Sequence, residues 1–95
     1  MTIEEIRKTI DSERAILLPL RGVVTSPFFK EQCQQALDDL DMLDYLCFGP
    51  GPERPSLQLV VWFLRIVVER RKSVEDPVTK WGYNAVAIPY DLQRR

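Results

Sequence analysis

Four clustered aspartates are the residues of this 95-residue chain with the clearest capacity for chemistry, at positions 38, 39, 41 and 44. Carboxylates bind calcium when a flexible turn makes them converge, whereas carboxylates on the outside of a regular helix point apart. The surrounding pattern predicts a helix, so we expect no metal site. Acid–base catalysis would need a shared pocket, and nothing in the sequence indicates one. The cluster is interpreted as a solvated face or as an acidic contact surface that uses Asp38, Asp41 and Asp44.

Two cysteines are the only candidate nucleophiles of the thiol type, Cys33 and Cys47. On one helix their Cα atoms would lie about 21 Å apart, and a disulfide needs about 7 Å or less. The chain has no histidine, which excludes Ser-His and Cys-His catalytic pairs. We therefore expect two buried free thiols. A reactive thiol and an intermolecular disulfide are the alternatives.

Binding of phosphate or nucleic acid has little support in the composition. The formal net charge is −1, whereas nucleic-acid-binding domains are usually clearly basic. The basic run at 70–72 suits the C-terminal end of a helix, where cations meet the negative end of the dipole. Prolines at 50 and 52 remove backbone donors that a phosphate loop requires. We predict no catalytic residues, no cofactor, no small-molecule substrate and no direct contact with nucleic acid.

No segment predicts a membrane span or a signal peptide. The longest apolar run, 57–68, contains Gln58 and Arg65 and is shorter than the roughly 20 residues that a span needs. The first five residues, Met-Thr-Ile-Glu-Glu, lack the basic and apolar start of a signal peptide. We expect a cytoplasmic protein without membrane contact.

The elements that must position these residues are mainly helices. Thr2 and Glu5 have the spacing of a capping box, which predicts a helix over 2–14. Ser26 and Pro27 form a strong start signal for a second helix, 27–48. Its apolar stripe repeats every three or four residues, at Phe29, Cys33, Ala36, Leu40, Leu43 and Cys47. A loop rich in proline and glycine follows at 49–55, and a third helix is expected over 57–72.

Two segments are harder to assign. Pro19 and Gly22 oppose a continuous helix over 15–25, which leaves two short helical turns that kink at Pro19, or a strand at the edge of a small sheet. We expect a buried irregular connector there. Residues 76 and 77 can start a last turn over 78–81 that Gly82 ends, and 83–90 is expected to be extended. The predicted fold is one domain over 1–95, a bundle of three to four helices with an extended C-terminal segment. The alternative is an α+β fold with a small sheet from 15–25 and 83–90.

The segment 57–72 is more apolar than one small bundle needs, because ten of the positions 57–68 are apolar. Such a helix must be covered on nearly all sides, by this chain or by another. Five aromatic residues stand in strongly apolar contexts and are expected in the core: Phe28, Phe29, Phe48, Trp62 and Phe63. Three others, Trp81, Tyr83 and Tyr90, are candidate contact residues or a cover over the core.

Charge is segregated along the chain, with a net −6 over 31–53 and a net +4 over 54–72. One interpretation is that neighbouring helices of opposite charge attract each other within the fold. The other is that two patches of opposite charge attract protein partners. The stretch 37–72 has an acidic helix, a Gly/Pro loop, a Ser cap and an apolar helix that ends in Glu-Arg-Arg. It looks like the helical, death-like effector-associated adaptor domains of bacteria, and the chain after Ser73 departs from that pattern. The resemblance implies an adaptor role.

The sequence thus predicts a non-catalytic protein-interaction module, either an adaptor or a self-associating subunit. It would use the apolar helix 57–72 and the C-terminal aromatic residues. The alternative function is a small regulator whose acidic face inhibits a basic nucleic-acid-binding protein or complex.

Overall fold

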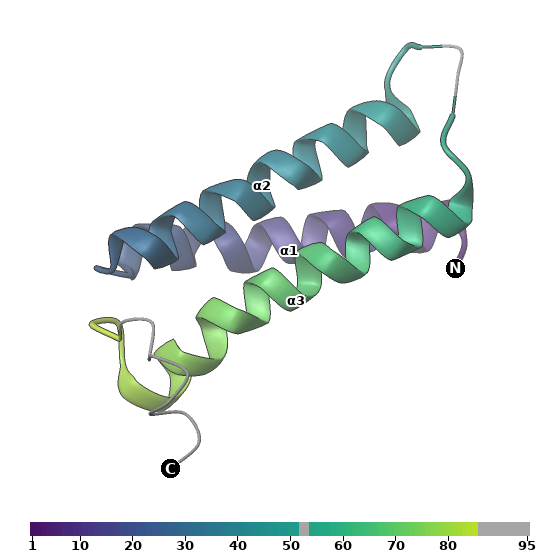
Figure 1. The fold of residues 1–95 in the computed structure, drawn as a ribbon. Helices are drawn as coiled ribbons and strands as arrows, with labels where there is room; N and C mark the ends of the chain where they lie inside the picture. Colours follow the sequence, from purple (N-terminus) through teal and green to yellow (C-terminus); the bar gives the residue numbers. More distant parts are fainter. Residues whose placement is uncertain (52–53, 86–95) are drawn as a thin grey trace.

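The protein is a bundle of three helices that run up, down and up (Figure 1). In this computed structural model, residues 1–51 and 54–85 are described. Helix α1 covers Ile3–Val23, α2 covers Pro27–Phe48 and α3 covers Leu57–Trp81. No strand occurs among the described residues. The predicted helical bundle is therefore confirmed.

Helix α1 is longer than predicted, because it continues through Pro19 and Gly22 to Val23. The irregular connector and the strand expected at 15–25 are both wrong. A proline inside a helix costs about 3 kcal/mol, but burying one leucine contributes about 1.5–3 kcal/mol. Leu17 and Leu20 are both buried by the continued helix. Pro19 itself is exposed, as is Ala15, whose carbonyl lacks its helical donor and can bind water.

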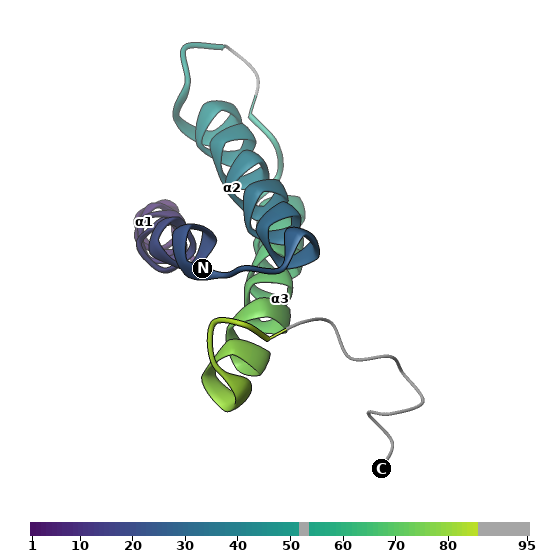
Figure 2. The ribbon, with the colours of Figure 1, turned by 90° about the vertical axis from the view of Figure 1, so that its left-hand side faces the viewer.

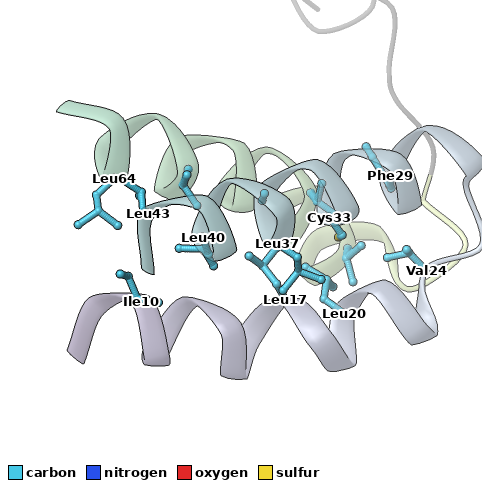
Figure 3. Close-up of a cluster of buried hydrophobic side chains, with 14 of the residues drawn as sticks. Ile10, Leu17, Leu20, Val24, Phe29, Cys33, Leu37, Leu40, Leu43 and Leu64 are labelled. Atoms are coloured by element: carbon cyan, nitrogen blue, oxygen red, sulfur yellow. The ribbon is translucent and has the colours of Figure 1, made fainter. Parts of the chain in front are cut away.

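Helix α2 begins and ends where the sequence predicts. The Ser26 hydroxyl accepts a hydrogen bond from the Phe29 backbone N–H at 3.4 Å, and Pro27 occupies the first turn. All six members of the predicted apolar stripe are buried. Figure 3 shows the labelled leucines of α2 filling the space between its ribbon and α1. This helix supplies the largest part of the core.

Helix α3 begins at the predicted cap, where the Ser56 hydroxyl accepts from the Leu59 N–H at 3.2 Å. It does not end near residue 72, because its buried stripe continues to Val74 and Val78. Pro77 lies inside the helix instead of starting a separate turn. Gly82 ends α3 as predicted, with a φ of 88° that residues with a side chain rarely adopt.

The end of α3 returns to the connection between α1 and α2. The Thr25 N–H donates to the Tyr83 carbonyl at 3.2 Å, and the Ala85 N–H donates to the Gly82 carbonyl at 3.0 Å. Residues 82–85 therefore form a turn, with Tyr83 and Asn84 at its centre. The rest of the segment expected to be extended, 86–90, lies outside the described residues, and so does Tyr90.

Two of the five aromatic residues expected in the core lie on the surface. Phe29 is buried, and Phe48 and Phe63 pack against the core. Trp62 is 57% exposed, and Phe28 is about half exposed. The core stripe of α3 includes Val60 and Leu64, and a residue two positions from each points to the opposite side of a helix with 3.6 residues per turn.

We expect Trp62→Ala to change the free energy of unfolding by less than about 1 kcal/mol, because most of its side chain contacts water in the folded state. Leu40→Ala, at a fully buried position of α2, should lower it by about 2–5 kcal/mol. Urea unfolding followed by circular dichroism measures both values. A loss as large for Trp62→Ala as for Leu40→Ala would contradict the exposed position of Trp62.

Candidate protein-interaction surface

The most buried ion pair among the described residues joins α1 and α3. Arg71 donates from Nε to Glu13 Oε2 at 2.8 Å and from Nη2 to Glu13 Oε1 at 2.9 Å. The Arg71 side chain is 12% exposed and that of Glu13 is 6% exposed. Arg71 Nη1 also donates to Glu75 at 2.7 Å. The hydrogen bonds to Glu13 raise the pKa of Arg71 above its usual value, although burial opposes this.

The other two helix pairs are also joined by ion pairs. Arg70 of α3 donates to Asp39 of α2 at 2.9 Å, and Asp39 accepts a second bond from Gln35 at 3.1 Å. Arg14 of α1 lies 2.7 Å from Asp41 and 3.5 Å from Asp44, both on α2. The acidic helix is thus complemented by arginines of both neighbours. The basic run at 70–72 contributes to these ion pairs and does not mark a helix end.

The predicted acidic surface is therefore divided. Asp41 and Asp44 share Arg14, although the Asp41 side chain is still 70% exposed. Asp38 is exposed and accepts a hydrogen bond from Gln34 at 2.8 Å. An open hollow of about 470 Å³ borders the Arg14 pairs, and in it Arg7 stacks 3.9 Å from the centre of the Phe48 ring. Within residues 1–51 and 54–85, no set of three carboxylates or thiols is arranged to hold a metal ion.

Both cysteines are free and buried on α2, as the sequence predicts. Burial raises the pKa of the Cys33 thiol, and the nearby Arg21 offsets only part of this effect. Burial also raises the pKa of Cys47, against the opposing charge of Arg54. Both thiols consequently stay protonated at neutral pH, the form that is a poor nucleophile.

Large apolar side chains are exposed on all three helices, and those of α3 are Leu57, Leu59, Trp62 and Trp81. Leu59 is 54% exposed, and Trp62 lines a hollow of about 530 Å³ with Met1, Leu57 and Val61. Two predicted contact residues, Trp81 and Tyr83, lie at the other end of α3, and each is more than half exposed. Figure 2 shows α1 on one side of α3 and no described helix on the other. We call the exposed side of α3 that bears Trp62, opposite the core stripe of Val60, Leu64 and Val67, the outer face of α3.

The sequence prediction missed Trp62 and Leu59 as surface residues. A signal for their position was present in the spacing of Val60, Leu64, Val67, Val74 and Val78, which are all buried. These five positions fix one side of the helix as the core side. Extending the stripe beyond residue 72 would have placed Trp62 on the other side.

These observations define an antiparallel bundle of three helices with an exposed tryptophan on the outer face of α3. Comparison of the chain with protein-family models, with curated proteins and with solved structures finds no match. The resemblance of 37–72 to effector-associated domains therefore carries no argument below. Across the described parts of the chain, no helix has the combination of length and hydropathy that crossing a bilayer requires.

We expect Arg71→Ala to lower the free energy of unfolding by about 3–5 kcal/mol, because it leaves the Glu13 carboxylate buried without a cation. The double variant Glu13→Leu, Arg71→Met should recover most of this loss, since it removes both charges of the pair and leaves neither buried alone. Arg14→Ala, a matched change in a more exposed pair, should cost less than about 1 kcal/mol. Thermal and urea unfolding of the four proteins tests this order. Equal losses for Arg71→Ala and Arg14→Ala would contradict it.

Both thiols should resist labelling in the folded protein at pH 8, because they are buried and protonated. We expect labelling with a water-soluble aromatic disulfide to be more than about a hundredfold slower than in urea-unfolded protein. The absorbance of the released thiolate gives both rates. Rapid labelling of either cysteine under native conditions would show that its side chain is accessible.

Proposed function

We propose that this protein is a non-catalytic interaction module, an adaptor or a self-associating subunit, that binds protein through the outer face of α3. The observation that carries this proposal is Trp62, a large aromatic side chain held 57% exposed in the middle of a regular helix turn. Tryptophan is among the residues that dominate binding energy in protein interfaces. Leu59, one turn away, extends the same apolar surface.

The inner side of α3 leaves its outer face as the side of this helix that can bind a partner. The inner side of α3 is occupied by core packing and by the pairs of Arg70 and Arg71. The apolar residues of the outer face have no corresponding partner among the described residues. Burying an exposed leucine or a comparable side chain in an interface contributes about 1.5–3 kcal/mol. A partner could therefore gain affinity there without any rearrangement of the core.

Exposed apolar residues at the two ends of α3 border the proposed surface. Leu57 and Trp81 lie seven positions from the buried Leu64 and Val74 and continue the core stripe at its two ends, and Tyr83 follows the helix-ending Gly82. Trp81 carries the Lys80 ammonium 4.8 Å from its ring centre. Aromatic rings beside a cation suit an interface that is partly apolar and partly wet. We include a cytoplasmic location in this proposal.

A second candidate function is regulation of a basic nucleic-acid-binding protein through Asp38 and Asp41. The exposure of Asp41 favours it, because its carboxylate can still attract a cation. The Arg14 pairs weaken the candidate, since they neutralise part of the acidic surface. The outer face of α3 therefore remains our first choice.

Site-specific photo-cross-linking tests the proposal. A photoreactive phenylalanine analogue at position 62 should give a discrete protein adduct in living cells, and the same analogue at the exposed Lys8 of α1 should give none. A third position, 41, reports on the acidic surface. Adducts from 41 but not from 62 would favour the regulator, and the absence of any adduct from 62 would contradict the proposed function.

A further inference from the structure

The outer face of α3 has a regular pattern opposite the core stripe. Exposed residues recur at intervals of four and three positions: Gln58, Trp62, Arg65, Glu69, Lys72 and Asp76. Such spacing places them along one line on a helix. The last four alternate in sign, from positive at Arg65 to negative at Asp76. Among residues 1–51 and 54–85 none of these four forms an ion pair, whereas the neighbouring Arg70 and Arg71 both do.

When two copies of this helix lie antiparallel, each charge on one copy faces an opposite charge on the other. When a second α3 runs antiparallel, Arg65 lies opposite Asp76 and Glu69 lies opposite Lys72. A two-fold axis between positions 69 and 72 produces each of these contacts twice, as in any symmetric dimer. A parallel arrangement in register would instead bring every charge against its like, which is unfavourable.

The same register places the exposed start of each outer face against the end of the other α3. Trp62 of one copy lies opposite Thr79 of the other, in the last turn of that helix, which ends at Trp81. Gln58 lies beyond the end of the other helix. The end of each α3 thus covers Trp62 of the other copy, and the charged middle lies between these two contacts.

We propose that two copies of this chain pair through the outer faces of their α3 helices, antiparallel and with the two-fold axis between positions 69 and 72. This inference rests on the proposed function and names its partner as a second copy. Alternating charge alone is also common on solvated helices. Here the reversal that pairs the charges also covers each exposed Trp62 with the end of the other α3, which a purely solvated face does not require. The formal net charge of −1 adds little repulsion between copies.

Charge reversal at exposed positions tests this register without touching the core. The 95-residue chain should elute at twice its mass of 11.1 kDa in size-exclusion chromatography with light scattering. Arg65→Glu places a carboxylate opposite Asp76, and Asp76→Arg places a guanidinium opposite Arg65. Each change should raise the dissociation constant of the dimer about tenfold or more, because like charges then face each other twice.

A double variant and a mixture of the two single variants make the test specific for this register. The double variant Arg65→Glu, Asp76→Arg should restore the dimer, because the pairs are exchanged and remain complementary. An equal mixture of the two single variants should form a heterodimer, in which both contacts join opposite charges. Lys8→Glu on α1 is the matched control for the change in charge, and it should leave the dimer intact.

Each remaining outcome overturns the inference. A wild-type chain that is monomeric at about 100 μM excludes the dimer, and adducts of position 62 with a different protein would then still support the proposed function. A wild-type dimer that Arg65→Glu and Asp76→Arg leave unchanged shows that the copies pair through another surface. Loss of dimer in both single variants without recovery in the double variant excludes this register.

Discussion

The buried pair of Glu13 and Arg71 is the constraint on which the arrangement of the helices depends. Both residues occupy positions of a core stripe, where every other member is apolar: Glu13 stands between Ile10 and Leu17, and Arg71 between Val67 and Val74. A charge in such a position must find its partner, because burial without one costs several kcal/mol. Sliding α1 by one turn along α3 would separate the two groups. The pair therefore selects one register among several that the apolar residues alone would accept.

The same two residues explain which helices could be predicted from the sequence. The core stripe of α2 is wholly apolar, from Phe29 to Cys47, and its limits followed from local pattern and capping alone. The stripes of α1 and α3 are interrupted by a charge and are followed by Pro19 and Pro77. Local rules end a helix at such points. Tertiary burial of the residues beyond each proline overrides those rules, and a contact between residues 58 positions apart cannot be read from a local window.

The position of Trp62 illustrates a different limit. Where nearly every residue of a segment is apolar, composition shows that it is hydrophobic but not which side faces the core. The side of α3 that faces the core can be identified only over the full length of the helix, when Val74 and Val78 are added to Val60 and Leu64. Once the core-facing side is known, the apolar residues of α3 divide into those that pack in the core and those that stay exposed. The proposed interaction surface consists of the second group.

Helix α3 therefore carries folding on one side and the proposed binding on the other. A chain of 95 residues has a small core and a correspondingly small stability. A partner that binds only the folded state adds about 2.7 kcal/mol of stability when its concentration is a hundred times the dissociation constant. That contribution is comparable with the cost of the proline inside α3. Binding at the outer face would thus stabilise the helix whose inner face holds Arg71 against Glu13, and association and folding would be thermodynamically linked through a single element.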